Sequence, residues 1–176
     1  PLIAYNGGLV LMYNENQEQP TVFLTVPISY DVTRIIYNKV KNTDVHVSLY
    51  INDHWYVEQM DAWASREINN TKVYPTIAGF ESMIDLWESN EEGPHKIMCM
   101  GPEDEIHALE MSLKETCSDK LNIYRSKSTY LELASKHVSK AVAIKKLLQE
   151  HMGFRLEDVV AFGDNYNDIE MLDTVG

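Results

Sequence analysis

The chain has 176 residues, a formal net charge of -12 and a hydrophobic content of 44%. Its acidity argues against a nucleic-acid partner, because the phosphate backbone binds basic surfaces. No apolar run approaches the roughly 20 residues of a membrane helix, and no signal-like leader is evident. We therefore expect a cytoplasmic protein that binds no membrane, with its two cysteines as buried reduced thiols.

The first third of the chain predicts strands and one helix. Residues 21–28 have the composition of a strand that ends near Pro27, and apolar residues at helical spacing predict a helix over 30–40. Residues 45–51 and 54–57 alternate around Asn52-Asp53, which is typical of a β-hairpin. Four aromatic residues could be read as a stacking platform for bases: Trp55, Tyr56, Trp63 and Trp87. Large aromatic residues more often pack in cores.

The pattern of strands and helices continues through the middle of the chain. It predicts helices over 80–87 and 103–117 and strands over 95–100 and 121–125. A further strand over 130–133 precedes Ser139, which has the position of a helix N-cap. Lys140 then falls in the first helical turn, where the helix dipole disfavours a cation. This lysine is either a solvated surface residue or the partner of an anion bound at the helix N-terminus.

Near the C-terminal end, residues 159–162 predict a buried strand that breaks at Gly163. A cluster of carboxylates and amides follows at Asp164, Asn165, Asn167 and Asp168. Such groups at the end of a strand in an open α/β sheet often bind ligands, and hard carboxylate oxygens suit Mg²⁺. The local alternative is that Asp164 and Asn165 or Asn167 only cap the next helix. A calcium loop is excluded, because its third and sixth positions are Tyr and Ile.

Three segments, taken in order, resemble the Cof-type phosphatases of the haloacid dehalogenase superfamily. They are Asn6-Gly7 after an apolar segment, Ser139-Lys140 at a helix start, and Gly-Asp-Asn-Tyr-Asn-Asp at 163–168. The resemblance implies an α/β protein in which 1–20 and 129–176 form a partial Rossmann-like core. It places the strands at 2–5 and 158–162 in one sheet. Residues 21–128 fit the inserted α/β cap domain of this family only by their length and by the alternation of predicted strands and helices.

The resemblance also assigns roles to single residues. Asp164 matches the metal-binding aspartate and Lys140 the phosphate-binding lysine, and both are expected to be catalytic. Asp168 is expected to support Mg²⁺ or to orient Lys140. The expected substrate-binding residues are Asn6, Gly7, Lys140 and Asn167.

Members of this family attack a phosphate monoester with an aspartate in an Asp-x-Asp-Gly segment and form an aspartyl-phosphate. No such segment occurs in the 176 residues, so the chain alone is expected to be inactive. The expected substrate is a small phosphorylated metabolite, with sugar phosphates, nucleotides, flavin mononucleotide and pyridoxal phosphate all open. Tyr50, Trp55 and Tyr56 are expected to select it. The alternatives are a non-catalytic ligand- or protein-binding fragment and a phosphomutase-type phosphotransferase.

Overall fold

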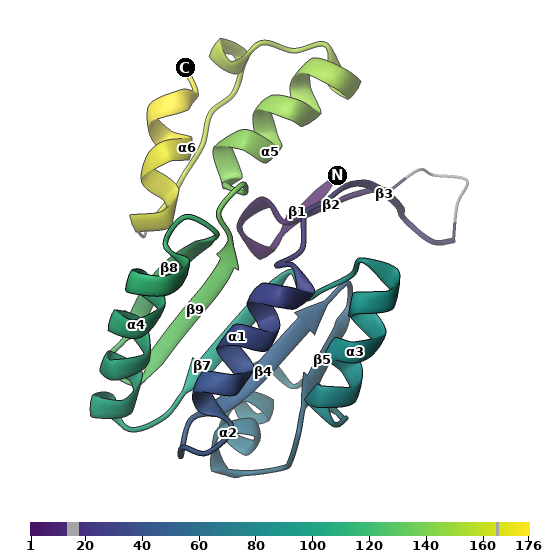
Figure 1. The fold of residues 1–176 in the computed structure, drawn as a ribbon. Coiled ribbons are helices and arrows are strands. Elements are labelled where there is room, and N and C mark those ends of the chain that lie inside the picture. Colours follow the sequence, from purple (N-terminus) through teal and green to yellow (C-terminus); the bar gives the residue numbers. More distant parts are fainter. Residues whose placement is uncertain (14–17, 165) are drawn as a thin grey trace. The chain divides into compact units, whose positions relative to one another are not determined.

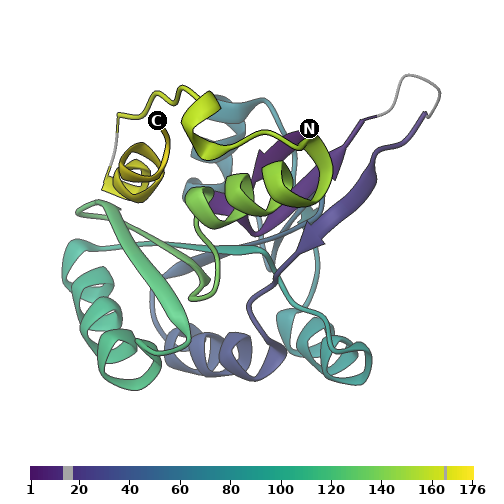
Figure 2. The ribbon, with the colours of Figure 1, turned by 90° about the horizontal axis from the view of Figure 1, so that it is seen from above.

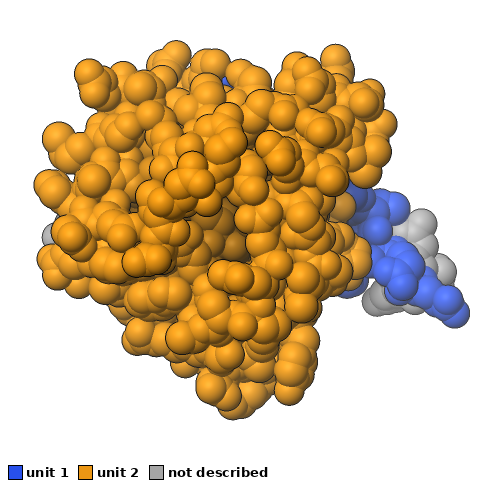
Figure 3. Space-filling model, turned by 60° about the horizontal axis from the view of Figure 1, so that its bottom comes forward, with its two compact units in different colours: residues 1–26, 137–176 blue, residues 27–136 orange. Residues whose placement is uncertain are grey.

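Two units divide the chain in the computed structural model, which describes residues 1–13, 18–164 and 166–176. Unit 1 consists of residues 1–26 and 137–176, and unit 2 consists of residues 27–136 (Figure 3). Unit 2 is one continuous stretch, whereas unit 1 is assembled from both ends of the chain. None of the helices in the described ranges is long and apolar enough to span a membrane.

Unit 2 is built on a six-stranded sheet with the order β6-β5-β4-β7-β9-β8. The strands are β4 (His46–Ile51), β5 (His54–Val57), β6 (Thr76–Ile77), β7 (Lys96–Met100), β8 (Leu121–Lys127) and β9 (Tyr130–Ser135). Neighbouring strands are antiparallel except for β5 and β6. β4 and β5 form the hairpin that the sequence predicts, with Ile51 paired to His54.

Three helices cover one face of this sheet: α1 (Tyr30–Val40), α3 (Phe80–Asn90) and α4 (Glu103–Cys117) (Figure 1). Their buried side chains form the main core with Leu49, Ile97 and Leu131 of the sheet. A fourth helix, α2 (Ala62–Thr71), packs on Trp55 and Val57. Tyr56, which lies between those two residues, packs on the main core. Since side chains alternate along a strand, α2 covers the opposite face.

Unit 1 contains a three-stranded antiparallel sheet with the order β1-β2-β3. Its strands are β1 (Leu2–Ala4), β2 (Leu9–Met12) and β3 (Thr21–Thr25). Helix α5 (Lys140–Leu147) lies over this sheet, where Ala143 and Leu147 pack on Val10 and Met12 (Figure 2). Helix α6 (Ile169–Thr174) contacts α5. Apolar packing between distant segments therefore holds the two chain ends together.

The prediction of a buried strand at 159–162 is wrong. These residues form no strand, and Val160 is 76% exposed and Phe162 90% exposed. They consequently share no sheet with β1, which pairs with β2. An apolar run indicates strand propensity, but a strand forms only beside a neighbour that offers N–H and C=O groups. No strand of the described ranges lies in that position.

Two predicted strands form but lie in a different unit from the one expected. β3 falls within the range 21–128 assigned to the inserted domain, yet it pairs with β2 in unit 1. β9 falls within the end segment 129–176, yet it pairs with β7 and β8 in unit 2. Local patterns predict a strand without naming its partner. The two compact units divide after residues 26 and 136, whereas the expected core and cap domains divide after residues 20 and 128.

Candidate functional site

Polar residues from both segments of unit 1 meet at the N-terminus of α5. Lys140 is the first residue of this helix, and Asn6 lies in the turn that follows β1. Asn167 and Asp168 belong to the helical turn Tyr166–Asp168 just before α6. Two side-chain contacts join them: Lys140 with Asp168, and Asn167 with Asn6. Together with Gly7 and Asp164 we name these residues the α5 cluster.

The turn Tyr5–Gly7 is shaped to fit against the start of α5. Its three residues have left-handed backbone angles, with φ of 53°, 57° and 100°. A Cβ on Gly7 would lie 2.3 Å from the carbonyl oxygen of Ser139, so only glycine permits this approach. Left-handed angles are unfavourable for tyrosine, whereas asparagine tolerates them, and strained backbone concentrates at functional sites. The turn thus fixes Asn6 relative to α5.

Lys140 and Asp168 form an ion pair at the start of α5. Ser139 caps the helix as the sequence predicts, because its Oγ accepts a hydrogen bond from the N–H of Val142 at 3.1 Å. The Asp168 carboxylate is buried, whereas the Lys140 side chain is 31% exposed. The carboxylate offsets the unfavourable interaction of the ammonium with the helix dipole. The ammonium nevertheless stays accessible to an anion from solvent.

The loop before α6 wraps around the same carboxylate. The backbone N–H of Asp164 donates to Oδ2 of Asp168 at 3.2 Å, while Lys140 donates to Oδ1. A Cβ on Gly163 would lie 2.4 Å from the Cβ of Asp168. Glycine is therefore required here to make room for that side chain. Asp164 itself is exposed.

The side chain of Asn167 is held by Asn6. Its Nδ2 donates to Oδ1 of Asn6 at 2.8 Å, and its own Oδ1 is buried with no hydrogen-bond partner in the described part of the chain. Asn167 is thus engaged by Asn6 and does not cap α6, while Asn165, the other expected cap, lies outside the described residues. An amide nitrogen carries two protons. Among the described residues, the bond to Asn6 uses one of them.

Asp164 is the one carboxylate of the α5 cluster with no hydrogen bond to its side-chain oxygens among the described residues, and its chemistry is compatible with Mg²⁺. The described ranges contain no group of three or more His, Cys, Asp or Glu that could surround a metal ion, and both oxygens of Asp168 already accept hydrogen bonds. Mg²⁺ usually takes one or two protein carboxylates and completes its shell with water and substrate phosphate. Asp164 is exposed and could supply one such carboxylate. Of the two roles left open for Asp168, the geometry favours orientation of Lys140.

A second polar network lies in unit 2, and sequence reasoning missed it. Nδ1 of His46 lies 2.7 Å from Oδ2 of Asp61, and Nε2 lies 2.9 Å from Oγ of Ser48. This has the connectivity of a Ser-His-Asp relay. Ser48 is fully buried, however, and its Oγ accepts a hydrogen bond from Nε1 of Trp55 at 2.9 Å. The hydroxyl is therefore closed to substrate. Two polar residues spaced as His-x-Ser on one face of a strand are the signal that could have found this network.

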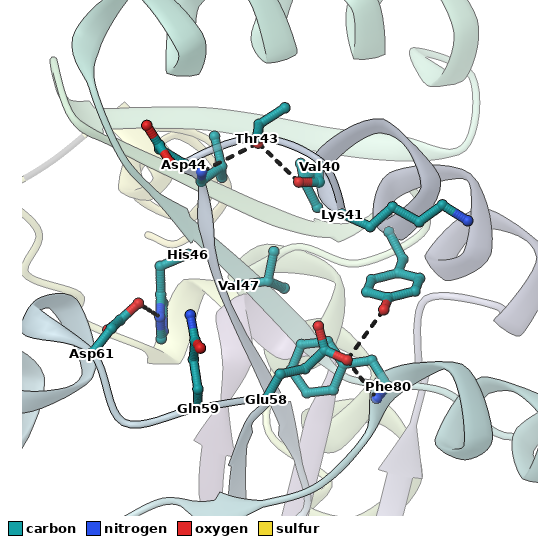
Figure 4. A pocket seen from close by; sticks show the side chains of 12 residues that line it. Val40, Lys41, Thr43, Asp44, His46, Val47, Glu58, Gln59, Asp61 and Phe80 are labelled. Carbon is teal, nitrogen blue, oxygen red and sulfur yellow. Dashed lines mark hydrogen bonds and ion pairs between the residues drawn. The ribbon is translucent and has the colours of Figure 1, made fainter.

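A cavity of about 310 Å³ opens beside the network (Figure 4). Its polar walls hold secondary structure together. Asp61 caps α2 by accepting from the N–H of Ala64 at 2.8 Å. Glu58 accepts from the N–H of Phe80 at 3.0 Å and from the hydroxyl of Tyr37 at 3.1 Å, which ties β5 to α3 and α1. We therefore place the candidate site at the α5 cluster of unit 1.

The three hairpin residues expected to select a substrate do not share one surface. Tyr50 and Trp55 stack with ring centres 6.0 Å apart and planes 10° apart, whereas Tyr56 packs on the other face of the sheet. Lys96, which sequence reasoning did not single out, lies opposite Tyr50 with its ammonium 4.4 Å from the ring centre. Burial lowers the pKa of this lysine. A single lysine at the start of an apolar strand is the signal that could have identified it.

Comparisons with known proteins match most or all of the chain. The family model described as haloacid dehalogenase-like hydrolase matches residues 1–176. A Haemophilus influenzae protein named "Putative phosphatase" is 30% identical over 99% of this chain and 62% of its own length. The HMP-PP phosphatase of Yersinia pseudotuberculosis is 28% identical over 76% of this chain and 46% of its own length.

A solved structure has the same fold. The crystal structure of TM0651 from Thermotoga maritima superposes with a TM-score of 0.80 and 28% identity. The match covers 98% of this chain and 61% of the Thermotoga chain. The 176 residues thus span less than two thirds of the length of these relatives.

Proposed function

The chain belongs to the haloacid dehalogenase-like hydrolase family, and from that premise we propose that it supplies the phosphate-binding and metal-binding groups of a Mg²⁺-dependent phosphatase. The reaction is hydrolysis of a small phosphate monoester. The observation that carries this proposal is the Lys140–Asp168 pair at the N-terminus of α5. Its ammonium is oriented by a buried carboxylate and remains accessible to an anion.

Lys140 acts on the charge of the phosphoryl group. Phosphoryl transfer depends chiefly on positioning and on stabilising charge on the phosphate oxygens. A fixed ammonium does this without reorganisation during the reaction. The helix N-terminus on which Lys140 stands adds a partial positive charge of its own. Asp168 keeps the ammonium in place, so its contribution is indirect.

Asn167 and Asp164 complete the proposed phosphate site. The second Nδ2 proton of Asn167 donates to a phosphate oxygen, since the first is held by Asn6. The Asp164 carboxylate would hold Mg²⁺, which neutralises phosphate charge when bound. The family resemblance implies an aspartate nucleophile in an Asp-x-Asp-Gly segment, and no such segment occurs among these residues. The α5 cluster therefore serves binding and charge stabilisation.

We assign unit 1 to the catalytic core and unit 2 to the cap that selects the substrate. Support for this assignment is that every member of the α5 cluster belongs to unit 1, and that unit 2 is inserted between its two segments. The substrate class is a small phosphorylated metabolite, a sugar phosphate or a similar ester. The name of the Yersinia relative, HMP-PP phosphatase, is in keeping with a small phosphorylated substrate.

The test is hydrolysis of p-nitrophenyl phosphate and a panel of sugar phosphates by the natural protein that contains these residues. Turnover is expected to require Mg²⁺. Lys140→Ala should lower kcat/KM by about 100-fold or more, as the loss of one preorganised charge stabiliser does in other enzymes. Lys145→Ala, an exposed lysine on the same helix, is the matched control and should leave kcat/KM unchanged. Absence of Mg²⁺-dependent turnover across the panel would refute the proposal.

A further inference from the structure

We infer that Asn6 is a positioning residue that sets the orientation of the Asn167 side-chain amide. Asn6 holds one Nδ2 proton of Asn167, so that the second is presented to the phosphate of the substrate. The family resemblance assigns the two asparagines separately, each as a substrate-binding residue. The final step of this inference, a hydrogen bond from the second Nδ2 proton to the substrate phosphate, rests on the proposed function.

The first support is the hydrogen bond itself. Asn6 and Asn167 are 161 positions apart, and Nδ2 of Asn167 lies 2.8 Å from Oδ1 of Asn6. A side-chain amide has a donor end and an acceptor end, and a half-turn exchanges them. Asn6 presents its oxygen to Asn167, and because an amide oxygen can only accept, Asn167 presents its nitrogen in return. In that orientation the second N–H of Asn167 can donate a hydrogen bond to an anion. In the opposite orientation the amide oxygen would face the anion and repel it.

The second support is the way Asn6 is held. It is the central residue of three with left-handed φ angles, and Gly7 beside it packs on the carbonyl of Ser139. This strained turn ties Asn6 to the same helix start that carries Lys140. Asn167 is consequently held by Asn6 of this turn, and its neighbour Asp168 is held by Lys140 at the start of α5. These contacts fix the position of the Asn6 side chain relative to α5, as expected of a residue that orients a neighbour.

The third support is the unsatisfied oxygen of Asn167. Its Oδ1 is buried without a hydrogen-bond partner in the described ranges, and a buried acceptor left unpaired is unfavourable. The amide keeps this orientation although its oxygen gains no hydrogen bond from it, so the contact that Nδ2 makes with Asn6 determines the orientation.

A double-mutant cycle tests the inference in the natural protein. Asn6→Gly removes the side chain while keeping a residue that adopts φ of 57° without strain. We expect it to lower kcat/KM for p-nitrophenyl phosphate about tenfold, and Asn167→Ala about 100-fold. If Asn6 acts through Asn167, the double variant equals Asn167→Ala. A further tenfold loss in the double variant would show that Asn6 acts on its own and would overturn the inference.

A second measurement does not depend on activity. The side-chain ¹⁵N–H₂ signals of Asn167, identified by their loss in Asn167→Ala, report its hydrogen bond by NMR. We expect them to move toward values of a free amide in Asn6→Gly and to stay in Asn6→Asp, because aspartate also accepts. Titration with inorganic phosphate should shift these signals in the wild type and much less in Asn6→Gly. Signals that are unchanged in Asn6→Gly would refute the inference.

Glu91→Gly is the matched control, since Glu91 is exposed in unit 2 and also has a left-handed φ, of 55°. It should leave both the NMR signals and kcat/KM unchanged. The two proposals fail separately. A wild type without phosphatase activity defeats the proposed function, while the NMR comparison still decides whether Asn6 orients Asn167.

Discussion

Lys140 and Asp168 lie 28 positions apart, and their ion pair ties the first turn of α5 to the turn before α6. Asp168 is buried, and its carboxylate accepts hydrogen bonds from the Lys140 ammonium and from the backbone N–H of Asp164. A buried charge without partners is strongly unfavourable. The position of the loop that carries Asp164 therefore depends on this pair.

Asp168→Asn is expected to weaken both the fold of unit 1 and the proposed activity. The change removes the charge that orients Lys140 while preserving the shape of the side chain. Because Lys140 is partly exposed and solvent screens the pair, we expect a loss of about 1–2 kcal/mol in the free energy of unfolding. Urea denaturation measures it. Asp173→Asn, at an exposed position of α6, is the control. Equal stability of the two variants would mean that the ion pair contributes nothing.

Asp164→Asn is expected to change metal dependence without changing stability. The residue is exposed, so the fold does not rely on its charge. Loss of a charged oxygen ligand should remove most Mg²⁺-dependent turnover and raise the Mg²⁺ concentration needed for half-maximal activity. A Mg²⁺ titration of the natural protein and its variant measures this shift. An unchanged Mg²⁺ dependence would show that the metal is held elsewhere.

His95 is expected to make unit 2 less stable in mild acid. Burial lowers its pKa from 6.5 to about 4, and its Nδ1 accepts a hydrogen bond from the N–H of Asn52 at 3.2 Å. Between these two pH values the unfolded chain binds a proton at His95 that the folded chain does not. The stabilisation is thus complete above pH 6.5 and is lost as the pH falls toward 4, by at most about 3 kcal/mol.

The measurement for His95 is the free energy of unfolding in urea at a series of pH values. His95→Asn keeps an acceptor for Asn52 but cannot be protonated, so its stability should fall less steeply in this window. His137→Asn, at an exposed position, should retain the slope of the wild type. If the slopes of His95→Asn and wild type coincide, His95 is not the titrating group.

Three glycine-to-alanine variants separate backbone strain from steric overlap. At Gly79 a Cβ meets nothing within 4 Å, so we expect a cost of about 0.5 kcal/mol from the loss of an N-cap glycine. At Gly153 the space is also open but φ is 68°, which should cost about 1–2 kcal/mol. At Gly7 both problems occur, and we expect at least about 2 kcal/mol. Thermal unfolding of the three variants measures the order. Equal costs at Gly7 and Gly153 would contradict the close packing on Ser139.

Elements whose signal is local could be predicted from the sequence. Helices α1 and α4 have the predicted bounds, because apolar residues at helical spacing specify a buried stripe. The hairpin at Asn52 follows from its turn residues. Helix α2 was missed, since its sequence is polar and contains weak helix formers, although its N-cap Asp61 was a usable signal.

Features that depend on distant partners could not be predicted. The exposed run at 159–162 has the composition of a buried strand, and composition does not reveal whether a neighbouring strand is present. For the candidate site, the sequence indicated residues that lie together in unit 1, but not their contacts. That Asn6 meets Asn167, and that Asp168 is occupied by Lys140, depends on how the two ends of the chain pack.

The discontinuity of unit 1 has a consequence for the order of folding. Unit 2 has all of its sequence once residue 136 has been synthesised, so it can form while the chain is still growing. In unit 1, Val10 and Met12 contact Ala143 and Leu147. These contacts close a loop that contains the whole of unit 2. Its entropic cost falls when the intervening residues are already compact. We therefore expect the α5 cluster to form late in folding. Substitutions that slow the folding of unit 2 should also delay the formation of this cluster.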